Sequence, residues 1–564
     1  MCGIAGLIRY QGLTPADRSR ASRLQSLLRH RGPDDDGIVV HPTAALVQTR
    51  LALVHPDPHP LPLQSHDCRY TLTYNGEIYN HAALRRELRH HYDFQTVTDT
   101  EVVLAALIHW GHHALARFEG MFALFLWDSH SRHALAAVDP LSVKPLVYHA
   151  SESQFAFCSE AGPLLDSGAL PFRPREEAIA EHLVAPYFSS SHQLPFANLN
   201  RLLPGSYLEL SGNSVFLGTY RSAATAPPAL LPALRQAVTS QSSAAAPVGL
   251  FLSGGVDSSL MAALAPAPMP AFTIDYGHSP EHFQDSLIVR SDDLPFARRV
   301  AALHSHPHHV VDAPDFDAAL ERTLRANDLI AAWEQEVSQN LLAAAAAPHV
   351  KAVLVGDAAD ETHFGYSFLL HPERLASPAP LLDYFGCLPA RIGAAHFVDK
   401  YRAFAESEGH NWRTPDDQRL AISCLIRHFW LTRLLHNGDI HLMAHSVEGR
   451  VPFADPAVLA CAAQVSLAAG LENGIEKHHL RLAAAEVLPP EIAWRPKSAL
   501  TKNLNARRAI YRLFQKLWKR HGECLSPYLP ADSLAKLPLP ATDRETGLCF
   551  RAAALLMWFS RFAQ

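Results

Sequence analysis

The sequence predicts two domains of different fold class, an α+β domain over residues 1–218 and an α/β domain over residues 219–564. In the first part, short strands outnumber helical segments, which favours a sandwich of antiparallel sheets between helices. In the second part, apolar strands alternate with helices, which favours a doubly wound parallel sheet followed by a mainly helical part. The length of 564 residues also exceeds one ordinary hydrophobic core, so two or more domains are expected.

The elements of the first domain are predicted from periodicity and turn residues. Helices, recognised by a period of 3.6 residues, are expected near 19–29, 81–90 and 100–109. Strands, recognised by alternation, are expected over 38–54, 70–74, 122–127 and 133–138. The strand that ends at Tyr74 is expected to stop at Asn75-Gly76, a dipeptide typical of hairpin turns. The last two strands are expected to pair as a hairpin around 128–131.

The second domain is predicted to follow a linker at 222–228, which is rich in Ala, Thr and Pro. Its short apolar strands are expected over 248–252, 271–275, 309–311 and 352–355. A helix is expected to begin at Ser258, directly after the first of these strands.

Composition and charge favour a folded protein without nucleic-acid or membrane partners. Hydrophobic residues make up 48% and charged residues 18%, which is typical of globular chains. The formal net charge of -6, without a basic block, argues against a nucleic-acid surface. The eight cysteines include no Cys-x-x-Cys pair, so neither a zinc ribbon nor a disulfide framework is indicated. No stretch has the pattern of a signal peptide or a membrane span, so a cytoplasmic location is expected.

The start of the sequence places Cys2 directly after the initiator methionine. Removal of Met1 would put a thiol and a free α-amine on one residue, the pair used by N-terminal nucleophile enzymes. An α-amine with a pKa of about 7.7–8.0 is partly unprotonated at pH 7 and can act as the base. The alternative is that Cys2 only begins a buried strand.

The stretch 253–259, Ser-Gly-Gly-Val-Asp-Ser-Ser, follows an apolar strand and opens a helix. Glycines let the backbone approach a ligand closely, and N–H groups at a helix N-terminus attract an anion. The serine hydroxyls add donors, and Asp257 can hold Mg2+. No lysine follows the glycines, so the stretch is not a Walker motif but is similar to the pyrophosphate loop of ATP pyrophosphatases. An ordinary glycine-rich turn is the alternative.

Three carboxylates, Asp357, Asp360 and Glu361, follow another predicted strand at 352–355. Ligands of open α/β sheets bind outside the carboxyl ends of the strands. We therefore expect these acids and the 253–259 loop to meet over one ATP, the alternative being a solvated acidic turn.

Together, motifs from both halves of the chain resemble the glutamine-hydrolysing asparagine synthetase family. The motifs that resemble its class II glutamine amidotransferase domain are Cys2-Gly3-Ile4, 29–34, 75–80, 98–101 and 143–146. The motifs that resemble its synthetase domain are 253–259, 356–361, 446–453 and 476–478. They follow the family's order and cover most of the chain.

The resemblance implies a glutaminase site on an N-terminal nucleophile hydrolase sandwich. Cys2 would attack the side-chain amide of glutamine, and Asn75 with the backbone of Gly76 would form the oxyanion hole. The residues that would bind glutamine are Arg50, Leu51, Asn75, Glu77 and Asp99. Released ammonia would travel inside the protein to the second site.

The resemblance also implies an ATP-pyrophosphatase domain that adenylates a carboxylate. ATP would be bound by Leu252, Ser253, Gly254, Gly255, Asp257, Ser258, Ser259, Thr273, Gly356 and Lys477. Asp257 and Asp360 would hold Mg2+, and Asp357 would be catalytic because many relatives have there a glutamate proposed to assist proton removal from ammonia. Arg495 and Lys497 lie in a basic segment that the family also carries, the alternative being a solvated basic turn.

Two segments depart from the family's pattern. Around 327–338, asparagine synthetases typically have a Thr-rich segment with an arginine that helps to grip aspartate, but this chain has residues such as Trp333 and Glu336. The loss of that cation weakens the case for a dicarboxylate acceptor. Val138 and Ser142 stand where the family usually has arginine and glycine, and we interpret that segment as a structural turn.

The sequence therefore predicts a ligase that uses L-glutamine and ATP to amidate a carboxylate, aspartate or an analogue, through an acyl-adenylate. The alternatives are a β-lactam-forming cyclase of the same family and a non-catalytic sensor of glutamine or ATP. The presence of Cys2 and of the polar residues of both predicted sites argues against these alternatives. The acceptor, the ammonia path, the pathway and the oligomeric state, for which a homodimer is one option, stay open.

Overall fold

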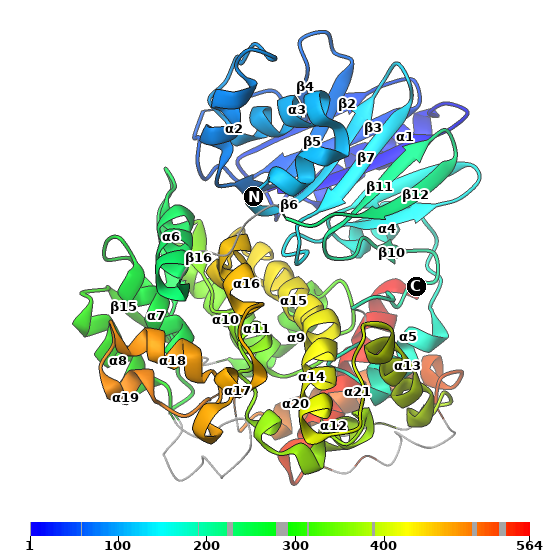
Figure 1. Ribbon diagram of the computed structural model, residues 1–564. Coiled ribbons are helices and arrows are strands. Elements are labelled where there is room, and N and C mark those ends of the chain that lie inside the picture. The colour runs from blue at the N-terminus through cyan, green and yellow to red at the C-terminus, as the bar shows by residue number, and fades with distance from the viewer. Residues whose placement is uncertain are drawn as a thin grey trace.

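The computed structural model describes residues 2–563 except 58, 190, 223–228, 278–291, 313–314, 386–387, 389, 499–502, 504, 530–536 and 538. The N-terminal domain lies above a larger C-terminal part in Figure 1, and the parallel sheet and the C-terminal helices lie side by side below it. All but Ser222 of the predicted linker at 222–228 lies outside the described residues.

The N-terminal domain is built on two antiparallel sheets, each of six strands among the described residues. The first sheet has the order β10 (Asn200–Arg201), β8 (Val147–Ala150), β9 (Gln154–Cys158), β1 (Cys2–Arg9), β3 (Ala44–Arg50) and β2 (Asp35–Val40). The second has the order β12 (Ser214–Thr219), β11 (Ser206–Ser211), β7 (His133–Val138), β6 (Gly120–Asp128), β5 (Tyr70–Ile78) and β4 (Leu63–Gln64).

The two sheets form the inner layers of a four-layer sandwich. Apolar side chains from both sheets meet between them, and the rings of Phe125 and Phe157 stack with centroids 4.0 Å apart. Helices α2 (His81–Leu88) and α3 (Asp99–Trp110) cover the outer face of the second sheet. Helices α1 (Pro15–Leu27) and α4 (Ala161–Asp166) cover that of the first sheet. The predicted α+β sandwich is therefore confirmed.

One turn prediction in this domain is wrong. The hairpin of β6 and β7 forms as expected, with Asp128 opposite His133. Strand β5, however, does not stop at Asn75-Gly76 but continues to Ile78 and stays paired with β6. A Cβ atom on Gly76 would lie 2.2 Å from the carbonyl oxygen of Met121. The glycine is therefore required by the close approach of the neighbouring strand and not by a turn.

The C-terminal part contains a parallel sheet with the order β15 (His308–Val311), β14 (Ala271–Ile274), β13 (Val248–Phe251), β16 (Ala352–Leu354) and β17 (Glu448–Arg450). The helices that share its hydrophobic core include α6 (Leu230–Ser242), α7 (Val256–Leu264), α8 (Leu294–Leu303), α10 (Gln335–Ala346) and α15 (Leu431–Met443). This arrangement confirms the predicted α/β class. The three-residue strand β17 was not predicted.

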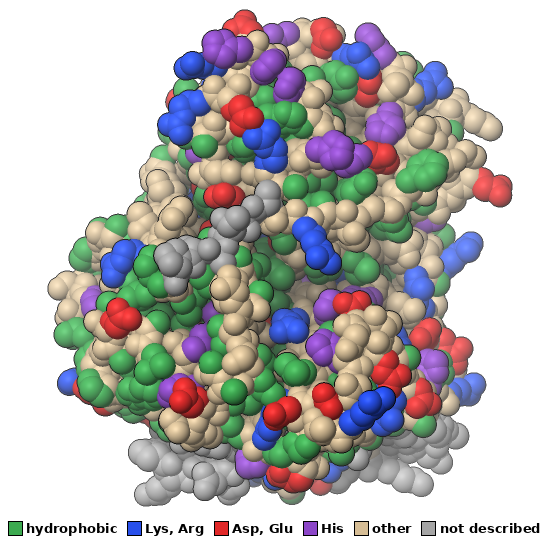
Figure 2. Space-filling view, viewed as in Figure 1, with side chains coloured by type: hydrophobic (Ala, Val, Ile, Leu, Met, Phe, Trp, Pro, Cys, Tyr) green, Lys and Arg blue, Asp and Glu red, His purple; other side chains and the backbone are tan. Residues whose placement is uncertain are grey.

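The remaining helices complete the C-terminal part. They are α9 (Phe316–Ala326), α11 (Ala359–Thr362), α12 (Pro378–Phe385), α13 (Ala394–Ser407), α14 (Pro415–Leu425), α16 (Pro456–Ala462), α17 (Leu467–Gly470), α18 (His478–Ala485), α19 (Pro490–Ala493), α20 (Arg507–His521) and α21 (Asp543–Phe562). None of the described helices is both long enough and apolar enough to cross a lipid bilayer. On the face shown in Figure 2, side chains of Lys and Arg are interspersed with those of Asp and Glu.

Residues 161–199 connect the two parts through a shared hydrophobic core. Helix α5 (Glu176–Val184) lies beside α13 and α21 in the lower part of Figure 1. Phe172 and Phe196 both contact the ring of Trp558 on α21, with centroids 5.2 and 5.0 Å apart. The two parts of the chain are thus joined by apolar packing as well as by sequence.

A turn at 139–144 carries one of the polar contacts between the two parts. The Asp139 carboxylate accepts hydrogen bonds from several backbone N–H groups of this turn, including that of Lys144. Ser142 has φ +53°, a conformation that glycine adopts most easily, which explains why glycine is usual there. The turn directs the buried Lys144 ammonium to the carbonyl oxygen of Gly449 in β17, 3.0 Å away.

Buried ion pairs also cross between the N-terminal domain and the parallel sheet. Arg31 is fully buried and contacts Glu160 at 2.8 Å and Asp439 of α15 at 2.7 Å. Arg450 of β17 is also fully buried, and it contacts Glu448 and Glu77, each at 2.7 Å. We call these six residues, together with Lys144, the interface cluster.

Replacement of Arg450 is expected to destabilise the protein strongly. Arg450→Met keeps much of the side-chain volume but removes the guanidinium that the buried carboxylates of Glu77 and Glu448 share, a loss of about 3–5 kcal/mol. Thermal unfolding should show a clearly lower midpoint, whereas the exposed Arg413→Met should unfold like the wild type. Equal midpoints for the two variants would contradict a structural role for Arg450.

Candidate active sites

Six of the predicted glutaminase residues line one cavity in the N-terminal domain: Cys2, Arg50, Leu51, Gly76, Glu77 and Asp99. The cavity lies where strands β1, β3 and β5 come together, and the N-terminus of α3 closes one side. Gln48 and Tyr74 also line it but were not predicted. Gln48 lies two residues before Arg50 on β3, so strand alternation could have placed both side chains on one face.

Cys2 is the first residue of β1 and its side chain is buried. Its Sγ atom lies 3.5 Å from the amide nitrogen of Gln48, which also donates a hydrogen bond to the carbonyl of Tyr74. Burial raises the pKa of the Cys2 thiol, and the nearby Arg50 guanidinium opposes that rise. The thiol therefore needs a base close by if it is to react as a thiolate.

Asn75 lies beside Cys2 and is completely buried. Its side-chain oxygen accepts a hydrogen bond of 3.0 Å from the backbone nitrogen of Cys2, which fixes the orientation of the amide. Its Nδ2 atom is buried and has no hydrogen-bond partner among the described residues. A buried amide donor without a partner is costly, so this group is available for an acceptor atom of a ligand.

The charged residues around the cavity already contact other groups. Arg50 pairs with Asp35 at 2.6 Å and also donates to the carbonyl of His55. Asp99 accepts hydrogen bonds from the Tyr74 hydroxyl and from a backbone N–H of β5. Burial raises the pKa of Glu77, and its partner Arg450 in the interface cluster opposes that rise. The cavity thus presents one cation, Arg50, and three acids, Glu77, Asp99 and Glu448 of β17, and a cation beside acids suits an α-amino acid.

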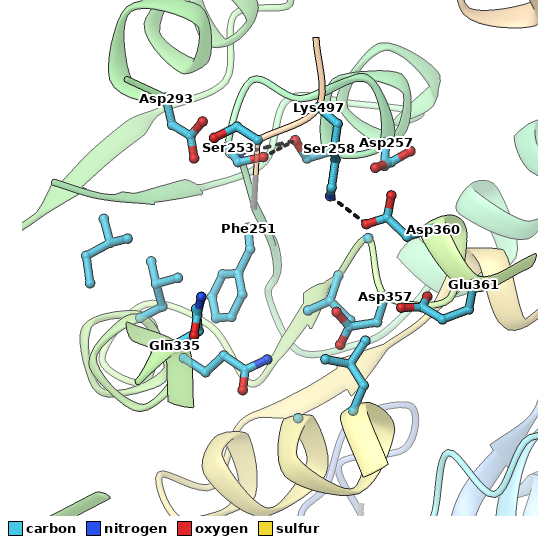
Figure 3. Close-up of a pocket in the computed structure, with 18 of the residues that line it drawn as sticks. Phe251, Ser253, Asp257, Ser258, Asp293, Gln335, Asp357, Asp360, Glu361 and Lys497 are labelled. Carbon is cyan, nitrogen blue, oxygen red and sulfur yellow. Dashed lines mark hydrogen bonds and ion pairs between the residues drawn. The ribbon is translucent and has the colours of Figure 1, made fainter. Parts of the chain in front are cut away.

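A second cavity of about 250 Å³ lies at the carboxyl ends of β13, β14 and β16. The predicted residues that line it are Leu252, Ser253, Asp257, Ser258, Thr273, Gly356, Asp357 and Asp360. Figure 3 shows the serines and Asp257 on one side and the acids at 357–361 facing them. The expectation that the loop and the acids share one site therefore agrees with the structure.

The 253–259 loop is held in shape by its own side chains. The hydroxyls of Ser253 and Ser258 lie 3.1 Å apart, and Ser258 also accepts from the backbone N–H of Ser253. Gly254 has φ +69°, and a Cβ atom there would lie 2.5 Å from the backbone nitrogen of Ala297. Gly255 is the N-cap of α7 and gives no side-chain cap, so N–H groups in the first turn of α7 have no partner within the helix and can bind an anion.

Two lysines hold the acidic residues of this cavity. Lys477 lies 2.5 Å from both Asp257 and Asp360, and Lys497 lies 2.5 Å from the other oxygen of Asp360. Burial alone would raise the pKa of Asp360, but the two ammonium groups lower it overall. Burial and the neighbouring Asp360 raise the pKa of Asp357 to about 6. The structure thus places Lys497 in the site, while Arg495 supports it by pairing with Asp293 at 2.6 Å.

Three residues around these acids have a strained backbone. Ala358, Phe364 and Lys477 all have positive φ, at +71°, +58° and +54°. Such conformations are unfavourable for residues other than glycine and are typical of functional sites. Gly365 directly follows Phe364. A Cβ atom on Gly365 would be 2.1 Å from an Asp360 carboxylate oxygen and 2.2 Å from the Lys477 side chain.

The far end of the second cavity is aromatic. Trp333 stacks on Tyr187 with centroids 5.1 Å apart, and Tyr187 packs on Trp430 at 4.6 Å. Tyr366 continues the series, 4.7 Å from Trp430 and 5.2 Å from Phe368. All five rings line the cavity, and none of them was predicted.

Glu336 lies in the segment 327–338, which lacks the arginine that the family resemblance led us to expect. Its role here is structural. It is fully buried and accepts hydrogen bonds from the backbone nitrogens of Ala332 and Trp333 and from the Asn327 side chain. His441 of α15 contacts the same carboxylate at 3.1 Å. Glu336 therefore fixes the segment that carries Trp333.

Comparisons with known proteins agree with this two-site architecture. A family model described as glutamine amidotransferase domain matches residues 1–221, and one described as asparagine synthase matches residues 229–559. The chain belongs to the asparagine synthase family.

Individual relatives are named as asparagine synthetases. Asparagine synthetase [glutamine-hydrolyzing] 3 of Bacillus subtilis is 27% identical, and the match covers 89% of this chain and 87% of the relative. Asparagine synthetase B [glutamine-hydrolyzing] of Escherichia coli is also 27% identical, over 88% of this chain and 81% of the relative. Among solved structures, glutamine phosphoribosylpyrophosphate amidotransferase from B. subtilis matches 63% of this chain and 82% of its own, with 15% identity and a TM-score of 0.29.

Addition of a methyl group at Gly365 is expected to disrupt the second cavity. In Gly365→Ala, the new Cβ atom collides with Asp360 and Lys477, so ATP affinity measured by calorimetry should fall about tenfold or more, a loss of about 1.4 kcal/mol. Gly393→Ala is the matched control, because nothing lies within 4 Å of a Cβ there. Unchanged ATP affinity in Gly365→Ala would show that this pair of side chains is not part of the nucleotide site.

Proposed function

We propose that this chain hydrolyses glutamine at the first cavity and uses the ammonia to amidate a carboxylate, activated by ATP, at the second. The observation that carries the proposal is that one chain holds both cavities, each lined by the residues that its chemistry requires. Membership of the asparagine synthase family supports it. On this proposal, residues 1–218 are the glutaminase domain and residues 219–564 the synthetase domain.

At the first cavity, Cys2 is the nucleophile. Once Met1 is removed, the nitrogen of Cys2 is an α-amine that accepts the thiol proton, and the thiolate attacks the amide carbon of glutamine. The C–N bond then breaks as the α-ammonium group returns its proton to the leaving nitrogen, so ammonia leaves and a γ-glutamyl thioester forms. Water hydrolyses this thioester to glutamate and restores the Cys2 thiol. The unpartnered Nδ2 of Asn75 and the backbone N–H of Gly76 stabilise the oxyanion. Arg50 binds the glutamine carboxylate, Glu77 and Asp99 bind its ammonium group, and Leu51 packs against it.

At the second cavity, a carboxylate oxygen of the acceptor attacks the α-phosphorus of ATP. The bond to the β-phosphate oxygen breaks, and pyrophosphate leaves with the electron pair. Ammonia then attacks the acyl carbon, AMP leaves, and one proton is released. The N–H groups and serines of the 253–259 loop bind the phosphates, Lys477 neutralises them, and Leu252 and Thr273 contact the base.

The residues at this cavity fit a magnesium ion. Asp257 Oδ1 is buried and accepts no hydrogen bond from the described residues, and carboxylate oxygens are ligands that Mg2+ prefers. Asp257 and Asp360 would hold the ion, which supplies charge neutralisation at the phosphates. Asp357, with its pKa raised to about 6, accepts the proton that ammonia loses.

Replacement of the nucleophile should separate the two reactions. Cys2→Ala is expected to reduce glutamine-dependent amide formation by about 1,000-fold or more, while free ammonia still supports it. Cys68→Ala, at an exposed cysteine, is the matched control and should use both nitrogen sources normally. Amide formation from glutamine in Cys2→Ala would refute the N-terminal mechanism.

Replacement of a predicted magnesium ligand should stop adenylation. Asp257→Asn keeps the shape but removes a negative charge, so pyrophosphate release should fall to background with glutamine or with ammonia. Asp399→Asn, at an exposed helical position, should leave the release unchanged. Normal release in Asp257→Asn would remove the metal assignment.

A further inference from the structure

The aromatic end of the second cavity adjoins the acids, because the Tyr366 hydroxyl donates a hydrogen bond to Glu361. It consists of Tyr187, Trp333, Tyr366, Phe368 and Trp430, which we call the aromatic wall. The five rings form one continuous series in which each packs on the next at 4.6–5.2 Å. Such a surface binds flat apolar groups through area burial and ring stacking.

The charged side chains that line the second cavity are mostly negative. Of the charged described residues that line the cavity, five are acids and only Lys497 is basic. Lys497 is paired with Asp360 at 2.5 Å, and Figure 3 shows it beside Ser258 on the phosphate side of the cavity. Among the described residues that line the cavity, a second carboxylate on an acceptor would therefore meet Asp357 and Glu361, while the one lining cation, Lys497, is already paired.

The aromatic wall and the nucleotide would use different residues of the cavity. The loop at 253–259 and the N-terminus of α7 receive the phosphates, and the apolar residues Leu252, Phe272 and Ile274 at the ends of β13 and β14 are available to the base. The acids at 357–361 follow β16, on the other side of β13. An acceptor whose carboxylate lies beside these acids has the aromatic wall within reach, because Tyr366 of the wall donates a hydrogen bond to Glu361.

The aromatic wall is rigid at Trp333, which lies in the segment where the family typically has an arginine. Trp333 is buried, its backbone nitrogen bonds to Glu336, and its ring lies at 10° to that of Tyr187. A ring held in this way is already in its binding orientation and loses little conformational entropy when a ligand stacks on it.

We propose that the acceptor of this enzyme is a monocarboxylate that carries an aromatic ring, attached by a short chain, and not a dicarboxylate such as aspartate. This inference rests on the proposed function of the second cavity and names the acceptor class that the cavity selects. The ring lies against the aromatic wall while the carboxylate faces the α-phosphate of ATP.

The test is pyrophosphate release by the full-length protein with ATP, Mg2+ and ammonium chloride. Three aryl acids, 3-phenylpropanoate, L-phenylalanine and N-acetyl-L-phenylalanine, distinguish a plain acid, a free amino acid and a peptide-like terminus. We expect at least one of them to give a kcat/KM about tenfold or more above that of aspartate and glutamate. An equal or higher value for aspartate would overturn the acceptor class and leave the proposed function intact. If neither the aryl acids nor aspartate or glutamate gives pyrophosphate release, both the acceptor class and the proposed function are overturned.

A variant of the wall locates the selectivity. Trp333→Leu should raise the KM for the preferred aryl acid about fivefold to tenfold with the KM for ATP unchanged, and Trp333→Phe should restore part of the loss. Trp412→Leu is the matched control, since this tryptophan lies outside the cavity. If Trp333→Leu raises the KM for ATP instead, the wall belongs to the nucleotide and the inference is wrong. If both KM values stay normal, it is also wrong.

Discussion

The ion pairs of Arg450 are the interaction on which the placement of the two cavities depends. One buried guanidinium joins Glu448, on the same strand of the parallel sheet, to Glu77, which lines the first cavity. Charges removed from water in this way tolerate little displacement, because a broken pair leaves an uncompensated ion inside the protein. Arg31 and Asp439 repeat the arrangement on α15, whose Gly438 lines the second cavity. The interface cluster therefore fixes the position of one cavity relative to the other.

The parts of the sites that could be predicted are those encoded by neighbouring residues. The loop at 253–259 makes its own hydrogen bonds, so its sequence alone indicates its conformation. Cys2 and Arg50 face each other across adjacent strands, and the resemblance to the amidotransferase motifs led us to expect them in one site. These assignments needed no knowledge of distant packing, which explains why motif reasoning reached them.

Tertiary packing decided the features that sequence reasoning missed. Asn75-Gly76 has the composition of a turn, but the backbone of β6 comes so close that the dipeptide stays in a strand. Strand β17, Glu-Gly-Arg, has no apolar alternation and exists because it pairs with β16. The aromatic wall comes from four separated segments, each of which contributes one or two rings without a motif. Its residues become a surface only when the fold brings them together.

The packing of residues 161–199 also has a consequence for the order of folding. Phe172 and Phe196 pack against Trp558, on a helix that the ribosome makes hundreds of residues later. During synthesis, the sandwich can form its inner layers early, but this apolar surface stays uncovered until α21 emerges. The nascent chain therefore exposes this apolar surface for most of translation. A chaperone that binds exposed apolar segments would act on this segment. The N-terminal part therefore completes its packing only in the last stage of synthesis.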